Sequence, residues 1–309
     1  MRQGQVAPKS KWTGNPQGGV KAPDALILPD PATRFARSAA RLDSLSDRHP
    51  MGQWLRFMAR LTEAQHAMAS AMGPITGPDQ VAVERAVTAR LPPLAADLYQ
   101  RDPTWRDGLA LLLDVANDSE TTAPARATVA SLHDRGVDGV EALADGFLGG
   151  CVDMADASAA LYVAAALQVY FTRLAASLPA PSLRLLPQRG LCPCCGSTPV
   201  SGVVTESGQA RGVRYLYCSL CATAWNHVRA VCITCGQSRS VALQGIEGDP
   251  GAVKAETCND CHTYAKMLYQ AHDMAVDPFA DDLATLGLDV LVAEAGWSRH
   301  APNPLLLVG

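Results

Sequence analysis

Cysteine pairs separated by two residues are the most chemically informative feature of this sequence. Four such pairs follow one another, and their members are Cys192, Cys195, Cys218, Cys221, Cys232, Cys235, Cys258 and Cys261. Two cysteines at this spacing can curl into a knuckle whose sulfurs face one cation, and two knuckles supply four thiolates at about 2.3 Å from a tetrahedral metal ion. The sequence therefore predicts two mononuclear metal sites with eight cysteine ligands.

The eight cysteines form two copies of one pattern. The second copy is offset by 40 residues from the first, from Cys192 to Cys232, and 22 residues separate the inner cysteines of each copy. Gly196 and Gly236 each follow the first knuckle of their copy, where a turn needs positive φ angles. Such repetition indicates a duplicated unit. A unit of about 30 residues buries too little apolar surface to fold alone, so its metal contributes to folding.

Four knuckles can combine into two sites in three ways. Pairing within each copy closes the shortest loops and is therefore favoured. An all-thiolate tetrahedral site suits zinc or a mononuclear iron of the rubredoxin kind, and the spacing does not decide between the two metals. Each site takes all four ligands from the protein, which leaves no open position for a substrate.

Two further cysteines and two histidines lie near or between these motifs. Cys194 matches Thr234 of the second copy, so it is surplus; it is interpreted as an inert neighbour, an alternative ligand or a thiolate with a lowered pKa. Cys151 is isolated and is expected in the core. His227 and His262 have no histidine counterparts in the repeat, so we expect ordinary surface or core side chains rather than ligands.

Composition limits the class of protein and its compartment. Hydrophobic residues make up 48% and charged residues 18% of the chain, as in a soluble globular protein, and the net charge of −4 argues against a general polyanion binder. Residues 1–23 are basic and rich in Gly and Pro without an apolar run, so we expect a flexible tail rather than a secretory signal. The protein is therefore expected in the cytoplasm, where ten cysteines indicate metal or redox chemistry rather than disulfides.

The segment before the cysteines has the periodicity of helices. Phe35, Ala39 and Leu42 recur at spacings of three and four, which places them on one helical face. Helices are expected over 30–47, 51–72, 80–89, 103–117, 123–134, 136–148 and 153–178. The last is long enough to suggest a membrane span, but Gln168 and Arg173 interrupt it, so we interpret it as the buried central helix of a bundle.

We predict an α+β protein in two parts, an N-terminal all-α helical bundle and C-terminal tandem modules of the rubredoxin or zinc-ribbon kind. The expected divisions are a helical domain over 24–180, a linker over 181–190, a first metal module over 191–230, a second over 231–276, and a C-terminal helix and tail over 277–309. Prolines mark the linker, and short β-branched runs between turns mark the modules. Gly296 is the expected stop of the C-terminal helix.

Several stretches of this sequence resemble the FdhE-type formate dehydrogenase accessory proteins. They are CPCCGSTPVSGVV, RYLYCSLCATAWNHVRAVCITCG, AETCNDCHTYAKM and DPFADDLATLGLDVLVAEAGWSRHAPNP, with weaker similarity in LILPDPATRFARSAARLDSL and HPMGQWLRFMARLTEAQ. The first knuckle of that family reads CPxCG, so Cys194 occupies its free position. The resemblance implies a cytoplasmic assembly factor that binds the catalytic subunit of a formate dehydrogenase before export. It also implies rubredoxin-like modules that bind iron.

Two alternatives stand beside this non-catalytic role. An iron-dependent electron-transfer module would need a reversible one-electron couple. A zinc-ribbon nucleic-acid binder would use Arg211, Arg214, Tyr215 and Tyr217, although alternation along a half-exposed strand explains the same pattern. The sequence contains no G-x-S-x-G, phosphate-loop or H-E-x-x-H motif. We therefore predict no enzyme, no nucleic-acid partner and no membrane insertion, and a homodimer is left open.

Five side chains are candidates for a partner-binding surface. They are Asp281, Asp282, Trp225, Arg229 and Arg299. Asp281 and Asp282 stand at an expected helix start, where they would equally serve as N-terminal caps. If they form a docking surface, replacement of both by alanine damages partner binding more than folding; if they are caps, it damages both equally.

Overall fold

The computed structural model describes residues 22–117, 121–206 and 211–306. Its N-terminal part is helical, as predicted. The helices are α1 (Arg34–Ser46), α2 (Gly52–Ala71), α3 (Gln80–Thr88), α4 (Thr104–Ala116), α5 (Ala123–Asp134), α6 (Gly136–Leu148) and α7 (Ala157–Ala176). Single 3-10 turns, Met154–Asp156 and Ala180–Ser182, flank α7. The predicted tail over 1–23 lies almost entirely outside the described residues.

α7 is the central helix of this layer, and α2, α4, α5 and α6 pack around it. The stretch Met154–Ala176 is long and apolar enough to cross a membrane, but 83% of its most apolar window is buried inside the protein. This agrees with a buried central helix. The buried Gln168 is satisfied on both sides, because its Oε1 accepts from Gln65 Nε2 (2.9 Å) and its Nε2 donates to the Ser219 carbonyl (2.8 Å).

Eight strands form one sheet in the described part of the chain. They are β1 (Leu26–Ile27), β2 (Pro199–Val204), β3 (Arg214–Cys218), β4 (Ala224–Asn226), β5 (Val241–Gln244), β6 (Val253–Cys258), β7 (Thr263–Tyr269) and β8 (Ser298–Arg299). The order is β1-β4-β3-β2-β7-β6-β5, and β8 pairs with β7. Each module contributes three antiparallel strands, and β2 runs parallel to β7 in the register Gly202↔Met267. The two modules are therefore halves of one continuous sheet.

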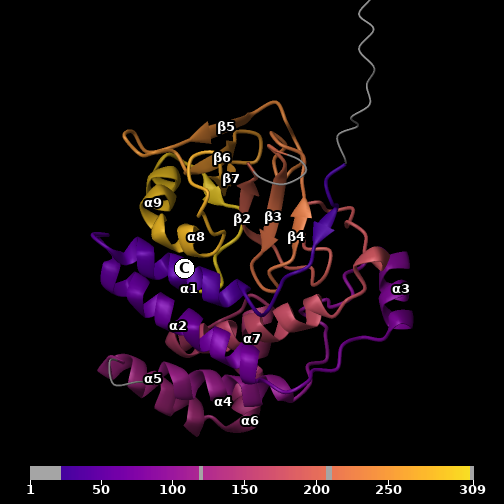
Figure 1. Cartoon of the computed structure of the whole chain (residues 1–309), viewed down its shortest axis with the longest axis vertical. Helices are drawn as coiled ribbons and strands as arrows, with labels where there is room; N and C mark the ends of the chain where they lie inside the picture. The colour runs from indigo at the N-terminus through magenta and orange to yellow at the C-terminus, as the bar shows by residue number, and fades with distance from the viewer. Residues whose placement is uncertain (1–21, 118–120, 207–210, 307–309) are drawn as a thin grey trace, which may run out of the picture.

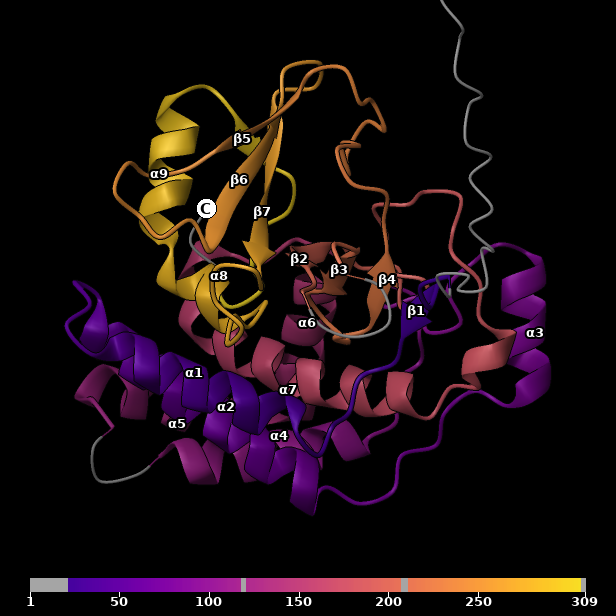
Figure 2. The ribbon, with the colours of Figure 1, turned by 45° about the horizontal axis from the view of Figure 1, so that its top comes forward.

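The two modules differ in their distance from the helical layer. α1, α2 and α4 to α7 lie together in the lower half of Figure 1, and the sheet lies above them. Figure 2 shows β2, β3 and β4 over α7, whereas β5, β6 and β7 extend away from α7 and the other N-terminal helices. β1 also brings the segment before α1 onto β4, with Leu26 opposite Trp225. The first module is thus enclosed on more sides than the second.

The C-terminal helix is interrupted, which corrects the prediction of one element. α8 (Ala280–Ala284) and α9 (Leu286–Glu294) are separated at Thr285, whose φ of −113° and ψ of 36° are not helical. The Thr285 hydroxyl donates to the Asp281 carbonyl (2.7 Å), which satisfies the end of α8. Gly296, with φ +101°, follows the end of α9 as predicted.

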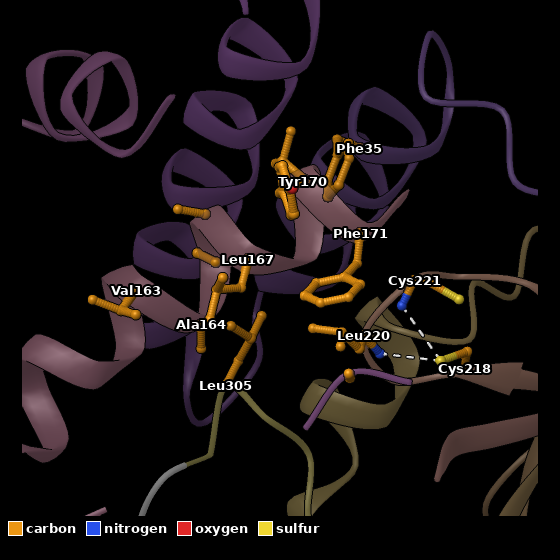
Figure 3. Close-up of a cluster of buried hydrophobic side chains, with 14 of the residues drawn as sticks. Phe35, Val163, Ala164, Leu167, Tyr170, Phe171, Cys218, Leu220, Cys221 and Leu305 are labelled. Atoms are coloured by element: carbon orange, nitrogen blue, oxygen red, sulfur yellow. Dashed lines mark hydrogen bonds between the residues drawn. The ribbon is translucent and has the colours of Figure 1, made fainter. Parts of the chain in front are cut away.

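Two buried apolar clusters reflect this arrangement. The larger one joins α1, α2, α4, α6 and α7 to the cysteines of the first module. Figure 3 shows Leu220, between Cys218 and Cys221, pointing toward Phe171 of α7. The smaller cluster packs β6 and β7 against α9, with Ala255, Leu268 and Val292 among its members. All four cysteines of the first centre therefore lie in the main core of the protein, and no cysteine of the second centre belongs to it, although Ala265 and Met267 of the second module also contribute to that core.

Candidate metal centres

Each repeat gathers its own four cysteines. The first centre consists of Cys192, Cys195, Cys218 and Cys221, and the second centre of Cys232, Cys235, Cys258 and Cys261. Within each centre all four sulfur atoms lie within 4.8 Å of one another, and no cysteine of the chain is in a disulfide. The predicted pairing of knuckles within each copy is confirmed.

The sulfur positions fit a tetrahedral ion. The closest sulfur–sulfur distances are 3.5 Å for Cys192–Cys221 and 3.4 Å for Cys195–Cys218 in the first centre, and 3.6 Å for Cys232–Cys261 and 3.7 Å for Cys235–Cys258 in the second. A tetrahedron with bonds of about 2.3 Å has edges of about 3.8 Å. Each centre could therefore hold one metal ion with little movement of its ligands.

The knuckles have the same backbone in both copies. The Gly196 N–H donates to the Cys192 carbonyl (2.9 Å) and the Gly236 N–H to the Cys232 carbonyl (3.0 Å), and the two glycines have φ angles of +80° and +74°. The residue after the second knuckle also has a positive φ, +58° at Ala222 and +54° at His262. These residues with positive φ lie at matching positions and turn the chain back toward the sulfurs in both copies. The glycines therefore allow the turn that was predicted for them.

Hydrogen bonds to sulfur favour the thiolate forms that a metal needs. Cys218 Sγ accepts from the N–H groups of Leu220 (3.4 Å) and Cys221 (3.3 Å), which are drawn as dashed lines in Figure 3. A threonine hydroxyl lies 3.1 Å from the last sulfur of each centre, Thr223 beside Cys221 and Thr263 beside Cys261. Donors around the sulfurs stabilise negative charge on them.

Burial of the first centre acts against ionisation of its thiols. It raises the pKa of Cys192, Cys218 and Cys221 well above the ordinary value, whereas at Cys195 burial is outweighed by hydrogen bonds with the neighbouring sulfurs and Ser197, which lower the pKa. Binding of a cation therefore releases protons from the three thiols whose pKa is raised. In the second centre burial opposes ionisation as well, but hydrogen bonds from Thr263 and the neighbouring sulfurs lower the pKa of Cys261 to about 7.

The two cysteines outside the centres differ from each other. Cys194 is buried beside the first centre; its N–H lies 3.4 Å from Cys192 Sγ and its carbonyl accepts from the Leu94 N–H (2.8 Å). Its backbone thus helps to hold the centre, while its sulfur belongs to neither set. Cys151 is exposed, so its predicted place in the core is wrong. It follows Gly149 and Gly150, which form a turn after the end of α6.

Neither histidine belongs to a four-ligand set. His227 is buried, and its Nδ1 lies 2.6 Å from Arg214 Nη2. Burial and the positive charge of Arg214 lower the pKa of His227 to about 4, so this imidazole is neutral. His262 is exposed at its knuckle. Both agree with the interpretation as ordinary side chains.

Three of the five candidates for a partner surface lie inside the molecule. Trp225 is buried and donates from Nε1 to the Arg189 carbonyl (2.8 Å). Asp281 and Asp282 are also buried. Buried side chains do not present a docking surface, so the prediction that these three residues form one is wrong. Arg299 is mostly buried, and Arg229 is exposed, with Nη1 3.4 Å from the Gly212 carbonyl.

The two aspartates complete intramolecular ion pairs instead. Arg41 holds Asp281 with two hydrogen bonds, Nε to Oδ2 (2.9 Å) and Nη2 to Oδ1 (2.7 Å). Asp282 is ion-paired with Arg299 and lies 3.4 Å from the fully buried Lys266 Nζ, which also pairs with Asp289. These contacts attach α8 to α1, β7 and β8.

The cap of α8 is a different residue. Asp277 Oδ1 accepts from the N–H groups of Phe279 (3.0 Å) and Ala280 (2.9 Å), and Asp281 Oδ2 accepts from the Asp277 N–H (2.8 Å). Asp281 therefore contributes to a reciprocal cap, whereas Asp282 does not. Sequence reasoning missed Asp277 and Lys266; the apolar neighbours of Lys266 in TYAKMLY, the sequence of β7, are the signal that a buried acidic partner exists.

Fold and centres together define a helical protein that carries a duplicated four-cysteine metal-binding module of the rubredoxin-like kind. Comparison with known families matches residues 23–187 to the FdhE N-terminal domain, 191–229 to the FdhE central domain and 230–306 to the FdhE C-terminal domain. The chain belongs to the FdhE family, which confirms the resemblance noted in the sequence.

Similar proteins span nearly the whole chain. The FdhE homolog of Edwardsiella ictaluri is 37% identical over 309 residues and covers 99% of each chain. Protein FdhE of Escherichia coli strain K12 / DH10B is 33% identical over 285 residues, which is 92% of this chain and 91% of that protein. The crystal structure of the FdhE protein from Pseudomonas aeruginosa matches with a TM-score of 0.83 at 34% identity, covering 91% of this chain and 98% of that chain.

Proposed function

We propose that this chain is a non-catalytic assembly factor that binds the catalytic subunit of a formate dehydrogenase in the cytoplasm before that subunit is exported. Membership of the FdhE family supports this role, because similar proteins over the full length carry the FdhE name. The protein itself supplies two four-cysteine clusters that could each hold a metal ion, built onto a helical body.

The complete ligand set of each centre is the observation that supports a non-catalytic role. Four cysteine sulfurs fill all positions of a tetrahedral ion, so no position is left for a substrate or an activated water. Such centres serve as structural or electron-transfer sites rather than hydrolytic ones. Both zinc and iron fit four thiolates. The family resemblance favours iron.

Binding of the client is the direct test. Purified chain and the separately purified catalytic subunit of the same organism's formate dehydrogenase are mixed and analysed by size-exclusion chromatography with light scattering. A stoichiometric complex with the subunit taken before export supports the proposal, and separate elution at micromolar concentrations of both contradicts it. The same light-scattering measurement on the chain alone decides whether it forms a homodimer.

Electron transfer by an iron-loaded centre is a second candidate function. The observation that favours it is the exposure of Cys235 in the second centre, where an electron donor or acceptor can approach the ligands. Anaerobic reconstitution with iron followed by potentiometric titration tests it. A reversible one-electron couple supports this candidate, and a protein that shows no couple removes it.

The structure argues against the nucleic-acid alternative, because most of the residues proposed to bind nucleic acid are not exposed. Arg214 is only 1% exposed and Tyr215 is buried, with its hydroxyl donating to the Asp24 carbonyl (3.0 Å). Arg211 is exposed, but it lies 3.7 Å from the carboxylate of Glu206. A single exposed arginine whose charge is partly neutralised provides too little positive charge to bind a polyanion.

A further inference from the structure

The two centres have the same ligands and the same backbone, but they differ in access to solvent. All four cysteines of the first centre are buried. In the second centre Cys235 is exposed and Cys261 is half-buried, while Cys232 and Cys258 are buried. Of the two copies of the module, the first therefore has an enclosed centre and the second has a centre that is open to solvent.

The cover of the first centre comes from the helical part of the chain. The segment 92–96, between α3 and α4, lies across the first knuckle, where the Ala96 N–H donates to the Cys195 carbonyl (3.0 Å) and Pro92 packs against Gly196. On the other side Leu220 enters the main core beside α7 (Figure 3). Access to these sulfurs requires the helical layer to separate from the module.

The matching positions of the second centre have no such cover. Gly236, the counterpart of Gly196, has open space where a side chain would begin. Asp260 takes the place of the core residue Leu220, and His262 that of Ala222; both are exposed. Thr234, the counterpart of the buried Cys194, is exposed as well. Polar residues between the ligands thus keep this knuckle at the surface.

A groove of about 590 Å³ opens beside the second centre. Cys232 and Cys235 form part of its wall, together with the exposed Arg189 and with His300. His300 Nδ1 lies 2.7 Å from the hydroxyl of Thr234, and its Nε2 has no hydrogen-bond partner within the described ranges. The groove is large enough for a small organic ligand to reach the two sulfurs, and it carries polar groups that such a ligand can bind.

We propose that the second centre is the exchangeable one: a thiol or another soft chelating ligand enters the groove and replaces Cys235 as a metal ligand, while the first centre keeps its ion. The exchange is a substitution without a change of oxidation state. The incoming sulfur binds as the Cys235 sulfur is released, and the proton of the incoming thiol passes to Cys235. This inference rests on the two metal sites of the proposed function and not on its client.

Metal release from the unaltered protein tests the inference. The chain is loaded with two zinc ions, mixed with the chromogenic chelator 4-(2-pyridylazo)resorcinol, and followed optically. One equivalent is expected in a fast phase and the other at least about 100-fold more slowly, because the first centre opens only with part of the core. Release of both ions in a single phase would overturn the inference and leave the proposed function standing. A chain that binds neither zinc nor iron would overturn both.

Pulsed alkylation with N-ethylmaleimide and mass spectrometry assigns the phases. Cys151, an exposed thiol outside both centres, is expected to react first and serves as the reference. Cys235 and Cys261 follow with the fast phase, and the first-centre cysteines react only with the slow phase. Modification of Cys192 or Cys195 before Cys235 contradicts the proposal.

A serine variant provides the matched control. Cys235→Ser removes the exposed ligand, so it is expected to abolish the fast phase and leave the slow equivalent unchanged, with a folded circular-dichroism spectrum. Cys195→Ser changes the equivalent buried ligand and is expected to lower the unfolding temperature instead. A fast phase that persists in Cys235→Ser would show that the labile ion is held elsewhere, and the inference would be wrong.

Discussion

Arg214 of the first module and Glu256 of the second form a buried ion pair, with Nη1 and Oε1 2.5 Å apart. Arg214 also donates from Nη2 to the carbonyls of Val228 and Val231, in the segment that connects the two modules. One side chain thereby joins β3, β6 and the connecting segment. The orientation of the second centre relative to the first depends on this contact as well as on the β2–β7 pairing.

Loss of this ion pair should be strongly destabilising. Arg214→Leu leaves the Glu256 carboxylate without its partner, and breaking a buried pair in this way costs about 3–5 kcal/mol. Urea unfolding of the metal-loaded variant measures the loss. The double variant Arg214→Leu, Glu256→Leu is expected to recover part of it because no charge is then left unpaired. An unchanged midpoint in the single variant would contradict the role of Arg214 as the joint between modules.

The knuckle glycines provide a matched pair of substitutions. Gly196→Ala and Gly236→Ala each place a side chain in left-handed backbone, at a cost of about 1–2 kcal/mol. At Gly196 the new Cβ would also lie 3.1 Å from Pro92 Cγ, whereas Gly236 faces open space. Gly196→Ala should therefore lower the free energy of unfolding more than Gly236→Ala does. Equal losses, or the reverse order, in urea titrations would contradict the different enclosure of the two centres.

Asp282 should behave as a core residue. Asp282→Ala leaves Lys266, which is fully buried, with one acidic partner fewer and Arg299 with only Asp289, so the expected loss is about 3 kcal/mol in thermal or urea unfolding. The control is Arg229→Ala, which removes an exposed side chain and should leave stability unchanged. An Asp282→Ala protein of normal stability that no longer binds the catalytic subunit would restore the docking-surface interpretation.

The lowered pKa of His227 leads us to expect that the stability of the protein depends on pH. Its pKa of about 4 in the fold is below the ordinary 6.5, so the unfolded chain binds a proton that the folded protein excludes. Stability should therefore fall as the pH decreases below about 6.5, with the full effect reached near pH 4. Between pH 7.5 and 5.5 the expected loss is about 1 kcal/mol.

The variant His227→Gln isolates this contribution. It keeps a polar group beside Arg214 but does not titrate, so its unfolding free energy should change less over the same pH range. Both proteins are compared at equal metal content, because acid also competes with metal for the thiolates. Identical pH profiles for the two proteins would show that His227 titrates normally in the fold.

The metal centres were largely predictable from sequence, because a knuckle is a local structure. The spacing of Cys192 and Cys195, and the glycine that follows each first knuckle, determine the turn within a few residues. The repeat then selects the pairing. Helix positions were also predictable, since apolar periodicity and turn residues act over similarly short distances.

The errors concern contacts between distant segments. Arg214 fits the alternation of a half-exposed strand, but β7, β6 and β5 extend the sheet beyond β2, and Glu256 of β6 provides its partner. Asp282 of α8 can be buried because Lys266 of β7 and Arg299 of β8 neutralise its charge. Nothing in the local pattern reveals such partners. The open face of the second centre did have a signal, the polar residues between its cysteines, which only comparison with the first copy makes visible.

Native mass spectrometry of the purified chain, prepared without added metal salts, tests the central claim most directly. The account predicts a mass equal to the polypeptide plus two metal ions, with all ten cysteines unbridged. Substitution of Cys218 or Cys258 should each remove one ion. A metal-free mass, or masses that show the knuckle cysteines joined in disulfides, would contradict the account.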